Sequence, residues 1–124
     1  MTDSRQRLDL GATVTEAQRL LDHGSPEEAT ALLAGAAASA PNSELELWQG
    51  LALLTEGLTQ IARNDAAAPT TLRRGAELLD AHEASPPHAL DIGGLVGWAR
   101  HLVAELGDAP AYPDAPPIPR FRLP

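Results

Sequence analysis

Apolar residues recur along most of this chain at the three- and four-residue spacing of an α-helix. The clearest run is Leu47, Leu51, Leu54, Leu58 and Ile61, which places five apolar side chains in one stripe along a helix. No stretch alternates apolar and polar residues over the length of a β-strand. The pattern therefore predicts an all-α domain, a single bundle of about five helices.

Signals for helix ends divide the chain into these predicted helices. The helices are expected at residues 13–23, 25–40, 43–64, from 70 or 71 to the Ser-Pro-Pro break at 85–87, and 92–107. Gly24 and Gly107 are read as stop signals, and Ser25, Ser43, Thr70 and Asp91 as N-caps. The domain organisation that follows is a flexible polar arm at 1–11, a helical domain at 12–107 and a Pro-rich tail at 108–124.

The tail has a composition of its own. It holds six prolines in 17 residues, which excludes a helix, so we expect it to be either disordered or extended on the domain surface. Its Arg-Phe-Arg-Leu sequence at 120–123 has two interpretations. It is either a docking peptide for a partner or a segment that folds back over the bundle, with Phe121 as the anchor in both cases.

Composition removes several classes of chemistry. The chain has no cysteine and no lysine, which excludes disulfides, thiolate metal sites and Schiff-base catalysis. The net charge is −8 and no basic face is present, which argues against nucleic-acid binding. No apolar run approaches the roughly 18 residues of a membrane span, and the first residues lack a signal-peptide pattern. We therefore expect an acidic cytoplasmic protein with no membrane partner; a homodimer is compatible with the sequence.

Four segments together resemble the small helical bacterial family known as "domain of unknown function 309". They are LWQGLALLTEGLTQIARND (Leu47–Asp65), AQRLLDHGSPEEA (Ala17–Ala29), LRRGAELL (Leu72–Leu79) and PPHALDIGGLVGWARHL (Pro86–Leu102). The resemblance covers about residues 12–106 and implies the helical fold.

The resemblance does not extend to the family's presumed functional motif on the second helix. That motif is Phe-His-x-His-Glu, followed by a further Glu and a Trp. The corresponding positions of this chain hold Glu27, Glu28, Thr30, Ala31, Ala34 and Ala37. A His/Glu site is therefore not carried over, and we expect neither a metal nor a cofactor.

The missing bulky side chains lead to a hypothesis about a ligand. Deleting a buried Trp or Phe costs about 3–5 kcal/mol, so either the helices have closed in or a cavity has been kept for a ligand. Glu56 points away from the leucine stripe. It lies either on a solvated face or, if the third helix is covered on two faces, opposite the second helix. In the second case Glu56 would line a ligand pocket between the two helices. The residues predicted to form this pocket are Thr30, Ala31, Trp48, Leu53, Glu56 and Gln60.

Two interpretations of function follow. In the first, the protein binds a small, largely apolar organic ligand, and Glu56 acts as general acid or base in a rearrangement or cyclisation, as in an accessory biosynthetic enzyme. In the second, the chain is a non-catalytic protein–protein interaction module that uses a helical surface or the tail. Whether the protein is an enzyme stays open at this stage. Metal-dependent hydrolysis is disfavoured by the missing ligands. His101 and Glu105, at i and i+4, are more simply an exposed ion pair than a metal site.

Overall fold

The computed structural model describes residues 2–107 and 116–123, with side chains from residue 10 onward. The described residues form five α-helices, two short 3₁₀ helices and no β-strand, as the apolar spacing predicts. The elements are α1 (Thr2–Asp22), α2 (Pro26–Ser39), η1 (Asn42–Glu44), α3 (Leu45–Ala62), α4 (Ala68–Asp80), η2 (Pro87–Ala89) and α5 (Ile92–Gly107). No helix among these residues is long and apolar enough to cross a membrane.

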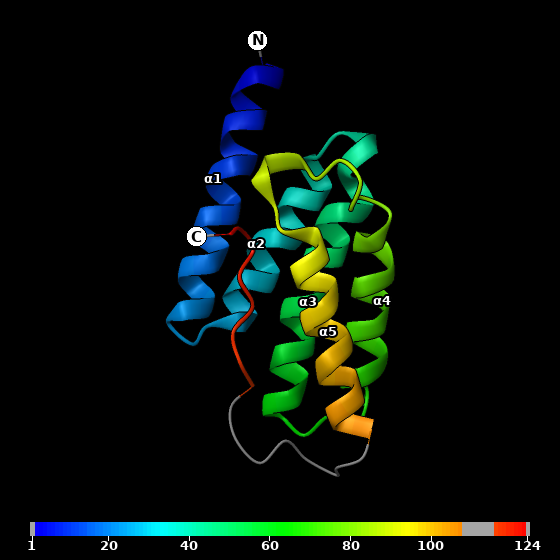
Figure 1. Cartoon of the computed structure of the whole chain (residues 1–124). Helices are drawn as coiled ribbons and strands as arrows, with labels where there is room; N and C mark the ends of the chain where they lie inside the picture. Colours follow the sequence, from blue (N-terminus) through cyan, green and yellow to red (C-terminus); the bar gives the residue numbers. More distant parts are fainter. Residues whose placement is uncertain (1, 108–115, 124) are drawn as a thin grey trace.

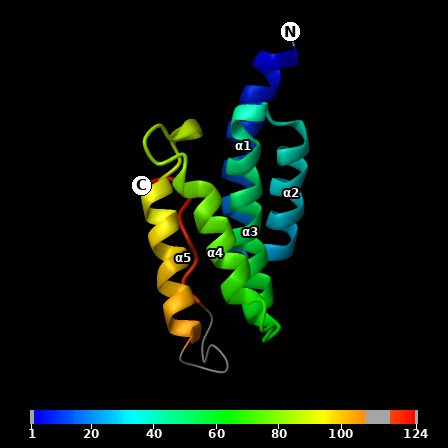
Figure 2. The same cartoon turned by 90° about the vertical axis from the view of Figure 1, so that its right-hand side faces the viewer.

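Helix α3 is the centre of the bundle. It packs against α2 on one side and α4 on the other, while α1 covers α2 and α5 covers α4 (Figure 2). The predicted leucine stripe is buried along its length, with Leu47, Leu51 and Leu54 fully inaccessible to solvent. The third helix is therefore flanked by α2 and α4 on two sides, as in one of the two alternatives that the sequence left open.

Helices α3 and α4 approach each other closely at two glycines. A Cβ atom added to Gly75 would lie 3.0 Å from the carbonyl oxygen of Gly50 and 3.2 Å from the Cβ of Leu53. A Cβ on Gly50 would lie 3.1 Å from the carbonyl oxygen of Gly75. Glycine at both positions favours this approach between the two backbones, because an added Cβ would force the neighbouring atoms to move by a few tenths of an ångström.

Two helices end in the way that the sequence predicts. Gly24 follows α1 with φ +78°, and the Ser25 and Gly24 amides donate to the carbonyls of Leu20 and Leu21 at 2.8 and 3.0 Å. This is the Schellman arrangement, which requires a left-handed residue that glycine adopts without strain. Asn64 takes the same conformation after α3.

Three predicted helix starts are wrong. Helix α1 begins at Thr2 instead of near Thr13, because a polar segment continues a helix without needing an apolar stripe and the single Gly11 costs only about 1 kcal/mol inside it. Helix α3 begins at Leu45, since Ser43 belongs to η1, and helix α4 begins at Ala68, which places Thr70 inside it.

Ser25 does precede α2, but its side chain makes no capping hydrogen bond. Asp91, in contrast, caps α5 through a 3.1 Å bond from the Gly94 amide to its carboxylate.

Residues 116–123, called the C-terminal strap below, run along the bundle between α1 and α5 (Figure 1). Phe121 is 1% exposed and is among the largest fully buried side chains. Leu90 and Arg122 form an isolated antiparallel bridge. In the structure this segment folds back over its own bundle, with Phe121 as the anchor. The other tail residues, 108–115 and 124, lie outside the described residues.

Candidate functional site

An open groove follows the outer face of α3 between α2 and α4 and has a volume of about 540 Å³. Leu45, Gln49, Ala52, Leu53 and Glu56 are the α3 residues that line it. They recur at helical spacing and so form one face of α3, which makes this face the floor of the groove. The walls come from Thr30, Ala34, Ala37 and Ala38 of α2 and from Arg74 and Leu78 of α4. We call it the alanine groove.

The short side chains of α2 explain why this groove exists. The hydroxyl oxygens of Thr30 and Thr55 lie 2.7 Å apart and join α2 to α3 at one end of the groove. Thr55 is fully buried and also donates to the carbonyl of Ala52 at 2.9 Å. The helices therefore touch, and the alanines that follow along α2 are too short to cover the α3 face. The volume missing from the second helix appears as an open surface groove, not as a closed cavity.

Three of the six predicted pocket residues meet in this groove. Thr30, Leu53 and Glu56 line it, from α2 and α3. Glu56 is exposed to solvent, so the prediction of a carboxyl group enclosed by apolar side chains is wrong. The physical reason is that α4 and α2 flank α3 without closing over its outer face. A solvated carboxylate lacks the dry surroundings that a buried general acid or base would have.

The other three predicted residues lie elsewhere. Ala31 is turned toward α1, where it lines a separate surface hollow with Leu10 and Leu32. Trp48 is fully buried and does not line the alanine groove. Gln60 also lies outside the groove, and its side-chain oxygen is buried without a hydrogen-bond partner. The predicted six-residue pocket is therefore not assembled as one site.

Trp48 belongs to a polar cluster that the sequence did not reveal. The indole nitrogen donates to the Glu44 carboxylate at 3.1 Å, and the same carboxylate oxygen lies 2.7 Å from Nε2 of His88. The ring centroids of Trp48 and His88 are 5.5 Å apart. His88 and Ala89 both have φ near +57°, a conformation that residues with a side chain rarely adopt. Adjacent left-handed residues leave no clear mark in a sequence, and nothing in it pairs position 44 with position 88.

The remaining candidate groups have structural roles. His101 and Glu105 form the predicted ion pair on α5. His23, near the end of α1, lies 2.7 Å from the Arg19 carbonyl through Nδ1, as expected for a histidine at a helix C-terminus. Within residues 2–107 and 116–123, no three His, Cys, Asp or Glu side chains come together as a possible metal site.

No family model, curated protein or solved structure matches this chain in the comparisons with known proteins. The resemblance in four segments therefore stays a prediction, and the geometry alone supports the proposals that follow.

Proposed function

We propose that this chain is a non-catalytic interaction module and that its alanine groove receives the apolar face of an amphipathic helix from a partner protein. The observation that carries the proposal is the open α3 face between two flanking helices. From Leu45 to Glu56 the floor spans 12 residues, or about 17 Å along the helix axis. That length fits about three turns of an added helix, whose anchors would recur at i, i+3 or i+4, and i+7.

The chemistry of the groove agrees with such a partner. Its apolar side chains are mostly alanines, which permit close approach of another helix backbone, and Leu45 and Leu53 add larger contacts. The polar groups Gln49, Glu56 and Arg74 are exposed and sit among these apolar ones. A partner helix would keep its own polar residues toward Glu56 and Arg74, so charge would set its orientation and apolar contact its affinity.

A small apolar organic ligand is a second candidate for the same groove. The volume falls within the range of roughly 300–1,000 Å³ found for small-molecule sites, and Thr30, Leu53 and Glu56 line it together. Such sites bury most of their ligand, however, and this groove is open along its length. We therefore place the partner helix first and assign no catalytic step to Glu56.

The test is a titration of the ¹⁵N-labelled chain, followed by amide NMR spectra. The probes are a four-turn amphipathic peptide with leucines at helical spacing and, separately, a small apolar molecule such as indole. We expect the peptide to shift amide signals of α2, α3 and α4 around the groove. Ala34→Gln fills the groove and should weaken this binding by about tenfold or more, as expected for loss of a central contact.

Ala31→Gln is the matched control, because Ala31 is an exposed residue of the same helix that lines a different hollow. It should leave peptide binding unchanged. Shifts caused by indole alone would favour the second candidate over the first. If neither probe perturbs the groove, or if both substitutions weaken binding equally, the alanine groove is not a binding site.

A further inference from the structure

The C-terminal strap is held in the manner of a bound peptide. Its side chains alternate as in an extended chain, with Pro119 and Phe121 buried and Ile118 and Arg120 exposed. The buried pair faces the bundle between α1 and α5, whereas Ile118 is exposed and the largely exposed Arg120 pairs with the Asp22 carboxylate of α1 at 3.2 Å. An extended segment with every second side chain in a pocket is a common mode of peptide recognition.

The bundle binds the main chain of the strap at several points. The side-chain amide of Gln18 donates to the Pro119 carbonyl at 3.1 Å and accepts from the Phe121 amide at 2.9 Å. The Asp91 amide donates to the Phe121 carbonyl at 2.7 Å, and the Trp98 indole donates to the Pro117 carbonyl at 2.8 Å. These contacts fix an extended backbone whatever its side chains are, so the buried Pro119 and Phe121 must provide the selectivity.

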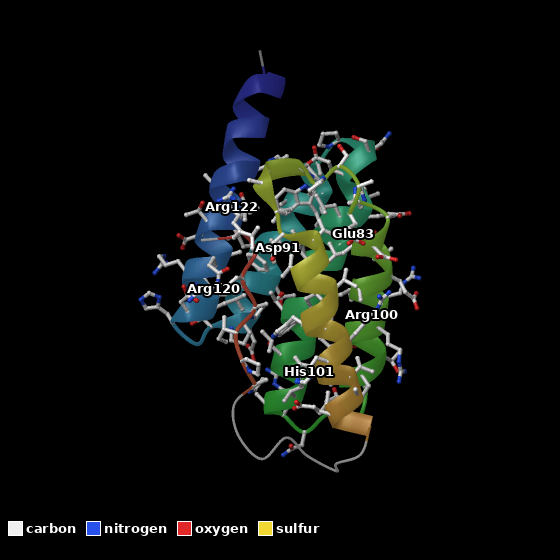
Figure 3. All side chains as sticks on the ribbon, in the orientation of Figure 1. Glu83, Asp91, Arg100, His101, Arg120 and Arg122 are labelled. Carbon is white, nitrogen blue, oxygen red and sulfur yellow. The ribbon has the colours of Figure 1, made fainter. Side chains whose placement is uncertain are left out.

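Arg122 adds a third selective contact. Its guanidinium donates to the His88 carbonyl at 2.9 Å, to the Thr15 hydroxyl at 2.7 Å and to the Gly11 carbonyl at 3.0 Å. The planar fork of arginine satisfies three acceptors on α1 and η2 at once, which lysine could not do in the same geometry. Figure 3 shows Arg120 and Arg122 on the strap and Asp91 at the start of α5.

We propose that this strap groove, formed around Gln18, Asp91 and Trp98, is a recognition site for extended Pro-x-Phe-Arg peptides and that its partner in trans is the strap of a second copy. A second copy carries the one segment already shown to fit. The strap–bundle hydrogen bonds join groups that a separate chain could equally supply. Exchange of straps would then link two copies reciprocally.

The short connection between α5 and the strap determines whether the groove of the unaltered chain holds its own strap or that of a second copy. Only eight residues separate α5 from the strap, and so short a connection gives an attached segment a local concentration on the order of millimolar. The chain's own strap therefore occupies the groove at protein concentrations below this local concentration. A strap from another copy enters when the resident strap has lost its anchor. This inference does not depend on the alanine groove.

Two full-length variants test the proposal by complementation. Phe121→Ala keeps the groove and removes the anchor of the strap, whereas Gln18→Ala keeps the strap and removes two of the bonds that the groove makes. Each variant alone should be monomeric at micromolar concentrations in light scattering. Mixed in equal amounts, they should form a one-to-one heterodimer in which the intact strap occupies the intact groove.

A synthetic peptide with the sequence of residues 116–124 keeps the test decisive if Phe121→Ala is poorly folded. The peptide should bind that variant at least about thirtyfold more tightly than a peptide carrying the same substitution. It should also raise the Tm of the variant progressively as its concentration increases above the Kd. Absence of both heterodimer and peptide binding would overturn the proposal. If the peptide binds the unaltered chain as tightly as it binds Phe121→Ala, it binds outside the groove, because the resident strap fills the groove of the unaltered chain. If the peptide binds but no heterodimer forms, the second copy is excluded as the partner.

Discussion

Replacing glycine by alanine should have opposite effects on stability at two positions, Gly75 at the close contact between α3 and α4 and Gly97 inside α5. In Gly75→Ala the new methyl group would meet the Gly50 carbonyl oxygen and a Leu54 methyl at 3.0 Å, and the Leu53 Cβ at 3.2 Å. Two of these atoms belong to the backbone or lie next to it, so relief requires the helices to separate. Overpacking of this kind costs about 1–3 kcal/mol, against which alanine gains up to about 1 kcal/mol over glycine inside a helix.

We therefore expect Gly75→Ala to lower the free energy of unfolding by about 1 kcal/mol, with a fall in Tm of roughly 3–6 °C for a chain of this size. At Gly97, inside α5, an added methyl group would meet no atom within 4 Å apart from its chain neighbours and the backbone of its own helix, so Gly97→Ala should stabilise by about 0.5–1 kcal/mol. Urea unfolding followed by circular dichroism measures both. If Gly75→Ala proves as stabilising as Gly97→Ala, the two backbones do not approach as described.

Two further predictions concern single side chains. Asp91→Ala removes the side-chain cap that binds the Gly94 amide and should lower the free energy of unfolding by about 1 kcal/mol, measured in urea. Ser25→Ala, at a cap position without a side-chain hydrogen bond, should change it by only a few tenths of a kcal/mol. Similar losses in both variants would refute the assignment of Asp91 as the cap. The hydrogen bond from Arg19 holds the pKa of Glu16 below its ordinary value. The Glu16–Arg19 pair thus stabilises the fold above the unfolded-state pKa of Glu16 and loses this effect as pH falls through the lower folded-state value. Arg19→Ala should raise the pKa of Glu16 in an NMR titration; an unchanged titration would contradict the pairing.

The order of the helices and the buried stripe of α3 follow from local signals in the sequence. The leucine stripe of α3, the stop at Gly24 and the cap at Asp91 each act within one or two helical turns, and each is found where it was predicted. The start of α1 escaped prediction because residues 2–12 are mostly polar and carry no long apolar stripe, while Gly11 is a residue type that disfavours a helix interior. The two glycines at the α3–α4 contact look unremarkable until α3 and α4 are placed side by side.

The candidate site was less predictable, because it depends on distances between helices. Spacing placed Glu56 opposite the leucine stripe correctly, but no local rule states whether α2 and α4 close over that face. They leave it open, so Glu56 is solvated and Trp48 lies in the core beside His88. The strap contacts escaped for the same reason, since Gln18 and Phe121 are 103 positions apart.

That separation has a consequence for how the chain is made. Helices α2 to α5 contact mainly their neighbours in sequence, so they can assemble as they emerge from the ribosome. The groove between α1 and α5 that Phe121 fills has no occupant until residues 116–123 have been synthesised. This side of α1 is therefore not covered until a segment 103 positions after Gln18 has been made, and until then α2 provides most of the contacts of α1.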